Sequence, residues 1–220
     1  MLDSATLQML GQGILETLYM TLVSSLFAYI IGIPLGIFLV LTAKNGLRPM
    51  PIVNSVLNVI VNIARSIPFL ILLVAVLPFT RLVTGTTIGS NATVVPLVIA
   101  AAPFIARLVE SSLKEVDYGV IEAGRSMGAT NTQIIIRILL KEARPSLLVG
   151  SAIAVTTILS YSAMAGFVGG GGLGNIAINY GYYLYENDIM LITVVLLVVI
   201  VQVLQEVGMR LAKVFDKRVN

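Results

Sequence analysis

The chain has 220 residues, of which 57% are hydrophobic and 11% charged, with a mean hydropathy of +0.97 and a formal net charge of +3. Soluble domains carry about a quarter charged residues, so the composition predicts an integral membrane protein with one domain over residues 1–220. The sequence has no cysteine or histidine, which excludes disulfides, thiolate nucleophiles, histidine metal sites and a Ser-His-Asp triad. No catalytic residue and no metal ligand is predicted.

Five apolar stretches are each long enough to cross a bilayer, which takes about 20 residues. They cover residues 15–41, 52–79, 93–109, 146–168 and 189–207. The second contains Arg65 and Pro68, and proline removes a backbone hydrogen bond, so a kink is expected there. Arg65 is either a snorkelling anchor near the membrane face or a functional residue that faces a polar cavity at depth.

The charges between these stretches predict the orientation. Nearly all of the 14 Lys and Arg residues fall on one side of the predicted membrane. They are Lys44, Arg48, Arg107, Lys114, Arg125, Arg137, Lys141, Arg144, Arg210, Lys213, Lys217 and Arg218. The other side has Arg81 alone, and its last loop carries only Glu186 and Asp188. The positive-inside rule therefore predicts an external N-terminus and a cytoplasmic C-terminus.

The cytoplasmic segment over about residues 110–145 carries two helix signals. Asp117 can cap a short helix over 120–127, and Gly128 can end it in left-handed geometry. Thr130 begins the T-x-x-Q pattern of a capping box, which predicts a second helix. The segment is either an interfacial amphipathic helix or a docking element.

In the docking interpretation, the small residues Ala123, Gly124 and Gly128 let a partner approach closely. A DNA-binding helix-turn-helix is disfavoured because few basic residues are present and the membrane flanks both sides, so no nucleic-acid partner is predicted. The residues alone support the interfacial and the docking interpretations about equally.

This segment resembles the EAA motif of ABC importer permeases, which reads Glu-Ala-Ala, three residues, Gly, nine residues, Ile, one residue, Leu-Pro. The matching positions are Glu122, Ala123, Gly124, Gly128, Ile138 and Leu140. Gly124 stands in place of the second alanine, and Lys141 in place of the proline. The stretches NIARSIPFLILL, PFTRLVTGTTIG, VPLVIAAAPFIARLVE, YSAMAGFVGGGGLG and INYGY extend the resemblance to permeases of bacterial methionine importers.

The resemblance implies an all-α, type I ABC importer permease fold with five transmembrane helices and a cytoplasmic coupling helix, in the bacterial inner membrane. It implies a homodimer, two cytoplasmic ATPase subunits and an extracytoplasmic methionine-binding (lipo)protein. ATP and Mg would be bound by the ATPase, so no cofactor is predicted for this chain, which lacks a G-x-x-x-x-G-K-[ST] loop and is not predicted to be an enzyme. The coupling residues would be Glu122, Ala123, Gly124, Arg125, Met127, Gly128 and Ala129.

A pathway on the axis of a two-fold dimer would be lined chiefly by the fourth stretch. The candidate pathway residues are Ser160, Tyr161, Ser162, Met164, Asn62 and Arg65. The hydroxyls among them either line the pathway or form hydrogen bonds across helices. The resemblance places Met164 at a narrow gate, whereas without it a methionine in a membrane helix indicates packing.

The run GGGGLG, residues 169–174, satisfies G-x-G-x-x-G. A membrane helix precedes it instead of the strand of a βαβ unit, so it does not predict a nucleotide site. Its glycines are Gly169, Gly170, Gly171, Gly172 and Gly174. They form either a turn or close-packing point, or an external gate or docking surface for the binding protein.

The predicted function is ATP-driven import of methionine by alternating access. The first alternative is a permease for another small amino acid. The others are an ion-coupled secondary transporter and a non-transporting membrane scaffold. A secondary transporter often shows inverted repeats and intramembrane acids, whereas here no repeat is evident and Glu16 alone approaches a predicted span.

Overall fold

The computed structural model describes residues 3–215, so Lys217 and Arg218 of the basic tail lie outside the described residues. All regular structure within residues 3–215 is helical, which confirms the predicted all-α class. The long helices are α1 (Ser4–Thr42), α2 (Pro51–Ser66), α5 (Ser90–Lys114), α9 (Arg144–Met164) and α11 (Asn187–Phe215). The short ones are α3 (Phe69–Ala75), α4 (Leu77–Thr84), α6 (Tyr118–Ser126), α7 (Asn131–Gln133), α8 (Leu140–Glu142) and α10 (Gly172–Ile176). Two π-helical segments, η1 (Ile134–Leu139) and η3 (Ala177–Tyr183), and a 3₁₀ segment, η2 (Ala165–Val168), join them.

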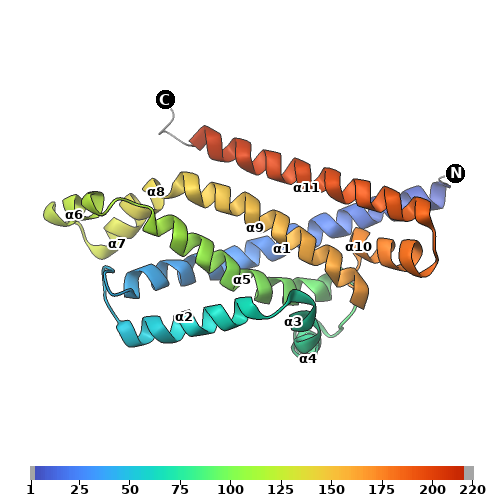
Figure 1. Ribbon diagram of the computed structural model, residues 1–220, viewed down its shortest axis with the longest axis horizontal. Helices are drawn as coiled ribbons and strands as arrows, with labels where there is room; N and C mark the ends of the chain where they lie inside the picture. Colours follow the sequence, from blue (N-terminus) through green and yellow to red (C-terminus); the bar gives the residue numbers. More distant parts are fainter. Residues whose placement is uncertain (1–2, 216–220) are drawn as a thin grey trace.

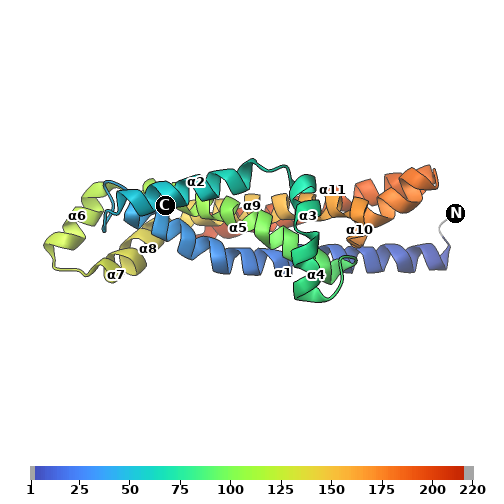
Figure 2. The same ribbon diagram turned by 90° about the horizontal axis from the view of Figure 1, so that it is seen from below.

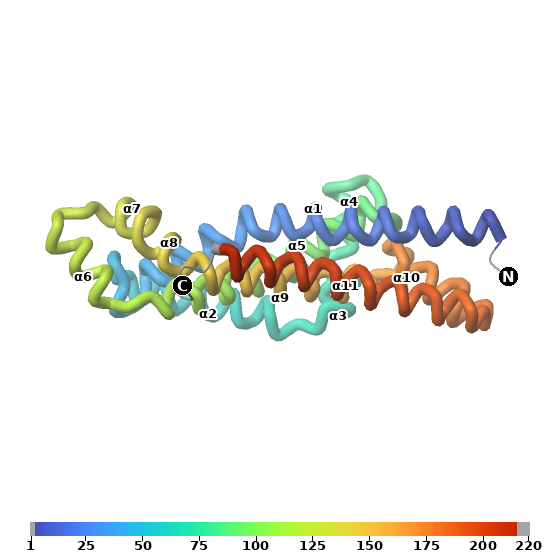
Figure 3. Tube along the Cα trace, turned by 90° about the horizontal axis from the view of Figure 1, so that it is seen from above, coloured from blue at the N-terminus to red at the C-terminus, as the bar shows by residue number. Residues whose placement is uncertain are grey.

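The long helices form an elongated bundle in which α5 contacts α1, α2 and α9, and α11 packs along α9 (Figures 1 and 2). Helices α6, α7 and α8 lie at one end, together with the end of α11 (Figure 1). We call this the α6 end. The other end holds α10, which begins within the glycine run 169–174, and the N-terminal part of α1 (Figure 3).

Two glycines of α1 explain its close contact with α5. A Cβ on Gly32 would lie 2.7 Å from Ile105 Cγ2, and one on Gly36 would lie 2.6 Å from the Ala106 carbonyl oxygen. Because small residues four apart lie on one face of a helix, they let the two backbones approach closely. The first helix also begins at Ser4, well before the apolar stretch, so α1 continues beyond the length needed to cross a bilayer.

The second predicted span is not one continuous helix. Helix α2 ends at Ser66 and α3 begins at Phe69, with a bend of 101° between them. Pro68 lacks an N–H group, and Ile67 before it is extended, so the helix cannot continue. The kink was predicted at the correct place, and the apolar stretch over 52–79 is divided among α2, α3 and the start of α4. Among the described residues, four helices are long and apolar enough to cross a membrane, or five if the bent pair counts as one span.

Candidate functional site

The break between α2 and α3 places two aromatic contacts beside the predicted pathway residues. The Phe69 ring at the start of α3 stacks on the Tyr161 ring of α9, with ring centroids 4.6 Å apart and an interplanar angle of 3°. Arg65, near the end of α2, is exposed, and its guanidinium carbon lies 6.0 Å from the centroid of the Phe104 ring on α5. The break therefore contacts both α5 and α9.

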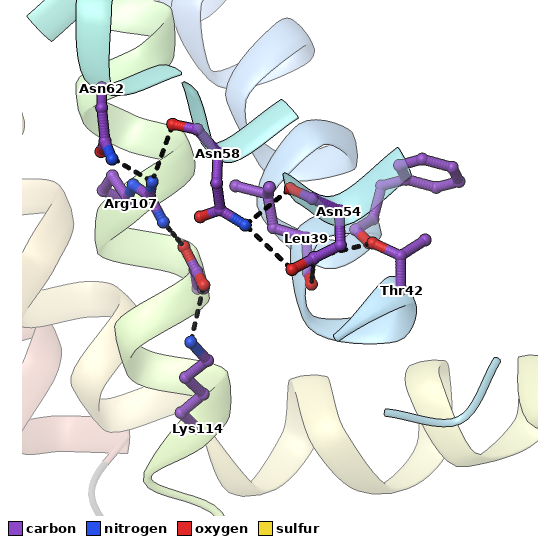
Figure 4. A network of polar contacts seen from close by, with 9 residues as sticks. Leu39, Thr42, Asn54, Asn58, Asn62, Arg107 and Lys114 are labelled. Carbon is purple, nitrogen blue, oxygen red and sulfur yellow. Dashed lines mark hydrogen bonds and ion pairs between the residues drawn. The ribbon is translucent and has the colours of Figure 1, made fainter. Parts of the chain in front are cut away.

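A polar network joins α2 to α5 (Figure 4). Arg107 donates to the Glu110 carboxylate at 2.5 Å and to Asn62 Oδ1 at 2.7 Å. Lys114 Nζ donates to the other Glu110 oxygen at 2.7 Å. The Glu110 side chain is only 7% exposed, so one nearly buried carboxylate compensates two cations.

The same network continues to α1 through two asparagines. Asn58 Nδ2 donates to the backbone and side-chain oxygens of Asn54, and Asn54 Nδ2 donates to the Leu39 carbonyl and Thr42 Oγ1 (Figure 4). Val61 is the only buried residue of α2. Polar contacts therefore supply much of what attaches α2 to the bundle.

The exposed face of α9 separates the predicted pathway residues into two groups. Ser160 and Met164 are exposed, at helical spacing on one face, and Met164 is 42% exposed. Ser162 is 1% exposed and donates to the Leu159 carbonyl of its own helix. The structure therefore contradicts the prediction that Ser162 lines a pathway. The Ser160 hydroxyl bonds to its own helix as well, at the Thr156 carbonyl, so neither serine bonds across helices.

The glycine run after α9 is attached to α1 and to the start of α5. The backbone N–H of Gly172 donates to Glu16 Oε2 at 2.7 Å, and that of Leu173 donates to Thr17 Oγ1 at 2.9 Å. These two side chains cap the first turn of α10, although they lie far away in the sequence. Thr93 of α5 donates to the Gly170 carbonyl at 3.1 Å.

Side chains would not fit at several of these glycines. A Cβ on Gly171 would lie 2.5 Å from Ser90 Oγ, and one on Gly174 would lie 2.2 Å from the Ala163 carbonyl oxygen. Gly170, Gly172 and Gly174 are buried. This geometry favours the close-packing interpretation over a docking surface for these three residues, whereas Gly169 and Gly171 are partly exposed.

The local structure of the segment after α5 follows the predicted caps. Asp117 accepts from the Gly119 N–H at 2.7 Å, and Gly128 has a φ of +78°. The N–H groups of Gly128 and Ala129 donate to Arg125 and Gly124, which satisfies the last carbonyls of α6 in a Schellman motif. The Thr130 capping box is present, and α7 begins there.

Two residues of α6 differ sharply in exposure. Met127 is 81% exposed at the end of the helix. Gly124 is buried, and a Cβ there would lie 2.5 Å from Ile138 Cδ1. The prediction that Gly124 lets a partner approach closely was therefore wrong, because this glycine accommodates Ile138 of the same chain. Glu122, Ala123, Arg125 and Gly128 are exposed, and Ala129 is partly exposed.

Replacing Gly124 with leucine is expected to destabilise the chain by about 2 kcal/mol, because the larger side chain would displace Ile138. Gly124→Ala should cost much less, since the only close approach of its Cβ is to the flexible end of Ile138 and alanine favours a helix. Ala123→Leu, at the exposed neighbour, is the control and should leave the melting temperature nearly unchanged. Equal melting temperatures for Gly124→Leu and Ala123→Leu would contradict the buried position of Gly124.

Two parts of this arrangement were missed in the sequence. The third apolar stretch was predicted to end at residue 109, whereas α5 continues to Lys114 and includes Glu110. The spacing of Arg107, Glu110 and Lys114 on one helical face was a signal for this cluster. The contact of Glu16 with the glycine run was not predicted, because no local pattern links the two. Within residues 3–215, no group of acidic residues is arranged to hold a metal ion.

Comparison with known sequences gives matches over nearly the whole chain. The sequence profile of the family described as "binding-protein-dependent transport system inner membrane component" matches residues 32–220. The chain is 50% identical over 203 residues to the "probable D-methionine transport system permease protein MetI" of Vibrio cholerae serotype O1, which covers 92% of this chain and 90% of that protein. It is 46% identical over 203 residues to the "methionine import system permease protein MetP" of Bacillus subtilis strain 168, covering 92% and 91%.

Solved structures give a matching result. A chain from "Inward facing conformations of the MetNI methionine ABC transporter" superposes with a TM-score of 0.96 at 45% identity, covering 98% of this chain and 100% of that chain. A chain from an "amino acid ABC transporter with histidines" superposes with a TM-score of 0.72 at 20% identity, covering 97% and 95%. At 20% identity, the similarity to this second structure shows a shared fold.

Proposed function

Because the chain belongs to the family of binding-protein-dependent transport system inner membrane components, we propose that it forms the membrane pathway of an ATP-driven importer for methionine. It is a multi-pass inner-membrane protein with the permease fold of an ABC transporter. The observation that carries the proposal is the likeness to methionine permeases, in sequence and in fold, over more than nine-tenths of the chain.

The proposed orientation has the α6 end in the cytoplasm and the N-terminus outside. The described basic residues in the loop after α1, towards the ends of α5 and α11, and in α6 to α8 support it, because these parts of the chain lie at the α6 end (Figure 1). The acids Glu186 and Asp188 precede or begin α11 at the other end. Five spans result when α2 and α3 cross as one broken span.

The proposed cytoplasmic partners are two ATPase subunits, which bind ATP and Mg and hydrolyse ATP, so this chain itself is not an enzyme and holds no cofactor. The α6–α7 turn is the proposed coupling element. Its position beyond the bundle supports this role (Figure 1). The exposed side chain of Met127 beside the Schellman turn supports it as well. The similar structure is described as a "MetNI methionine ABC transporter", which is a precedent for such a complex.

We place the pathway at the axis of a homodimer, fed from outside by a methionine-binding (lipo)protein. The exposed face of α9 with Ser160 and Met164, and the polar end of α2 with Asn62 and Arg65, are the surfaces that would face it. Polar groups at membrane depth face water or protein rather than lipid. Alternating access would then move the α2–α3 break relative to α9.

Transport in liposomes tests this proposal. The chain, its ATPase and its binding protein are reconstituted with ATP inside, and uptake of L- and D-methionine is measured. ATP-dependent methionine uptake is expected. If only a different amino acid is taken up, the chain is a permease for that amino acid. Uptake driven by an ion gradient without ATP would support a secondary transporter. Absence of uptake of any solute would favour a scaffold.

Met127→Asp is expected to weaken ATPase binding at least tenfold, because a charge replaces an exposed apolar side chain at the proposed contact. Gly128 is a poorer test position, since its φ of +78° makes any side chain strain the turn itself. Co-purification of the ATPase and its binding constant are the measurements. Ser126→Ala, on the same helix, is the control. Unchanged ATPase affinity in Met127→Asp would remove α6 from the coupling interface.

A further inference from the structure

Arg65 carries a positive charge that the described chain does not compensate. Its side chain is exposed, and its guanidinium carbon lies 6.0 Å from the centroid of the Phe104 ring. Arg107, one turn further along α5 than Phe104, is instead bonded to Glu110 and Asn62. Of these two arginines at similar positions along the bundle, Arg107 therefore has a carboxylate partner and Arg65 has none within the described residues.

The depth of Arg65 makes this charge costly. Phe104 lies about 15 Å from Lys114 and about 21 Å from Ser90 along α5, at roughly 1.5 Å per residue. The hydrocarbon core of a bilayer is about 30 Å thick, so a membrane centred on α5 would hold this ring well inside it. Snorkelling arginines lie close to the ends of spanning segments. Arg65 lies near the end of α2, where the chain bends by 101° into the apolar helix α3 instead of continuing into a charged loop.

A second copy of the chain offers no free carboxylate at this depth. Of the acids of residues 3–215 other than Glu110, Glu206 lies inside α11, about 14 Å before its end, and is already paired with Arg210. The others lie towards the two ends of the bundle; they are Asp3, Glu16, Glu115, Asp117, Glu122, Glu142, Glu186 and Asp188. Glu110 is 7% exposed and is already shared by Arg107 and Lys114. Within residues 3–215 a homodimer therefore supplies no free carboxylate for Arg65, and an intramembrane charge without a partner indicates a site for a ligand.

From this imbalance we infer that Arg65 binds the α-carboxylate of the transported amino acid as it passes the middle of the membrane. This inference rests on the proposed transport function. A guanidinium presents paired N–H donors that match a carboxylate, and a charge-assisted pair is strongest where water is scarce. The Phe104 ring positions the guanidinium through its face.

Asn62 supplies a second donor for the same carboxylate. It lies one turn before Arg65 on an exposed part of α2. Its Oδ1 accepts from Arg107, and within the described chain its Nδ2 group makes no hydrogen bond, so that group remains to donate. The thioether of methionine needs no polar partner, which agrees with a site selective for the carboxylate end.

The first experiment measures transport per ATP in the reconstituted complex with saturating methionine-loaded binding protein. Arg65→Gln is expected to lower methionine uptake about tenfold or more, the effect of losing one charge-assisted hydrogen bond, while stimulated ATP hydrolysis stays within about twofold. Arg65→Lys should restore much of the uptake. Ser66→Ala is the matched control, because its hydroxyl bonds only to the Asn62 carbonyl of its own helix.

The second experiment uses the unmodified complex of permease and ATPase, so it does not depend on a variant that folds. Phenylglyoxal modification of each arginine is followed by mass spectrometry in the presence of methionine or of methioninamide, which lacks the carboxylate. Methionine should slow modification of Arg65 several-fold, and methioninamide should not. Arg107, paired with Glu110, is the internal reference.

Equal modification of Arg65 with either compound overturns the inference, as does wild-type uptake per ATP in Arg65→Gln. Loss of complex assembly in both Arg65→Gln and Arg65→Lys would assign Arg65 a structural role and also overturn it. If the unmodified complex itself imports no methionine, the proposed function fails instead, and that result is distinguishable from the others.

Discussion

Replacing Glu110 with glutamine is expected to destabilise the chain by about 3 kcal/mol, the lower part of the range for breaking a buried ion pair. The Glu110 carboxylate is 7% exposed and accepts from both Arg107 and Lys114. Its removal leaves the guanidinium of Arg107, whose side chain is 19% exposed, without its counter-charge. Lys114 is 57% exposed and can turn towards water, which is why the lower part of the range applies.

The loss should extend beyond α5, because Arg107 also bonds to Asn62 of α2. Since α2 buries only Val61, its attachment depends on this network, and Glu110→Gln is expected to expose α2 to proteolysis. The melting temperature in detergent and the rate of protease cleavage in 51–66 are the measurements.

Glu206→Gln is the matched control for this substitution. Glu206 pairs with Arg210 on α11, with side chains 62% and 77% exposed, and exposed pairs contribute about 0–1 kcal/mol. An equal effect of the two substitutions would contradict a structural role for the buried network. The double variant Arg107→Met/Glu110→Met should lose less stability than the sum of the two single variants, because it leaves no unpaired buried charge between them.

Gly174→Ala is expected to destabilise the chain by about 3 kcal/mol or more, because no space exists for a methyl group. Its Cβ would lie 2.2 Å from the carbonyl oxygen of Ala163 and 2.6 Å from the Ala163 Cα. Both atoms belong to the backbone of α9, so a change of side-chain rotamer cannot relieve the clash. Either α10 or the end of α9 must move, and with them the contacts of Glu16 and Thr17.

Gly11→Ala is the control for this prediction. Gly11 lies inside α1, where an added Cβ would meet nothing within 4 Å. Alanine favours a helix over glycine by up to about 1 kcal/mol, so this variant should melt at the same temperature or slightly higher. If Gly174→Ala and Gly11→Ala have the same melting temperature, the glycine run is not closely packed.

The short-range features of this chain were predictable because they depend on neighbouring residues. Asp117, Gly128 and Thr130 each act on backbone groups within a few positions, so the caps of α6 and α7 follow from the sequence. The apolar composition likewise determines that the chain enters a membrane, and Pro68 determines where α2 stops.

Burial and long-range pairing were decided only by the fold. Ser160 and Ser162 are the same residue type two positions apart, yet one is exposed and the other buried, because only the latter faces the interior. Gly124 leaves the space that the Ile138 side chain occupies. Glu16 accepts from the Gly172 N–H across a separation of 156 residues. Such contacts depend on which helices become neighbours, and a local pattern carries no information about the residue on the opposite helix. The sequence therefore determined an all-helical membrane chain with its caps and its kink, whereas tertiary packing decided which polar groups are paired with one another and which, like Arg65, remain open to a ligand.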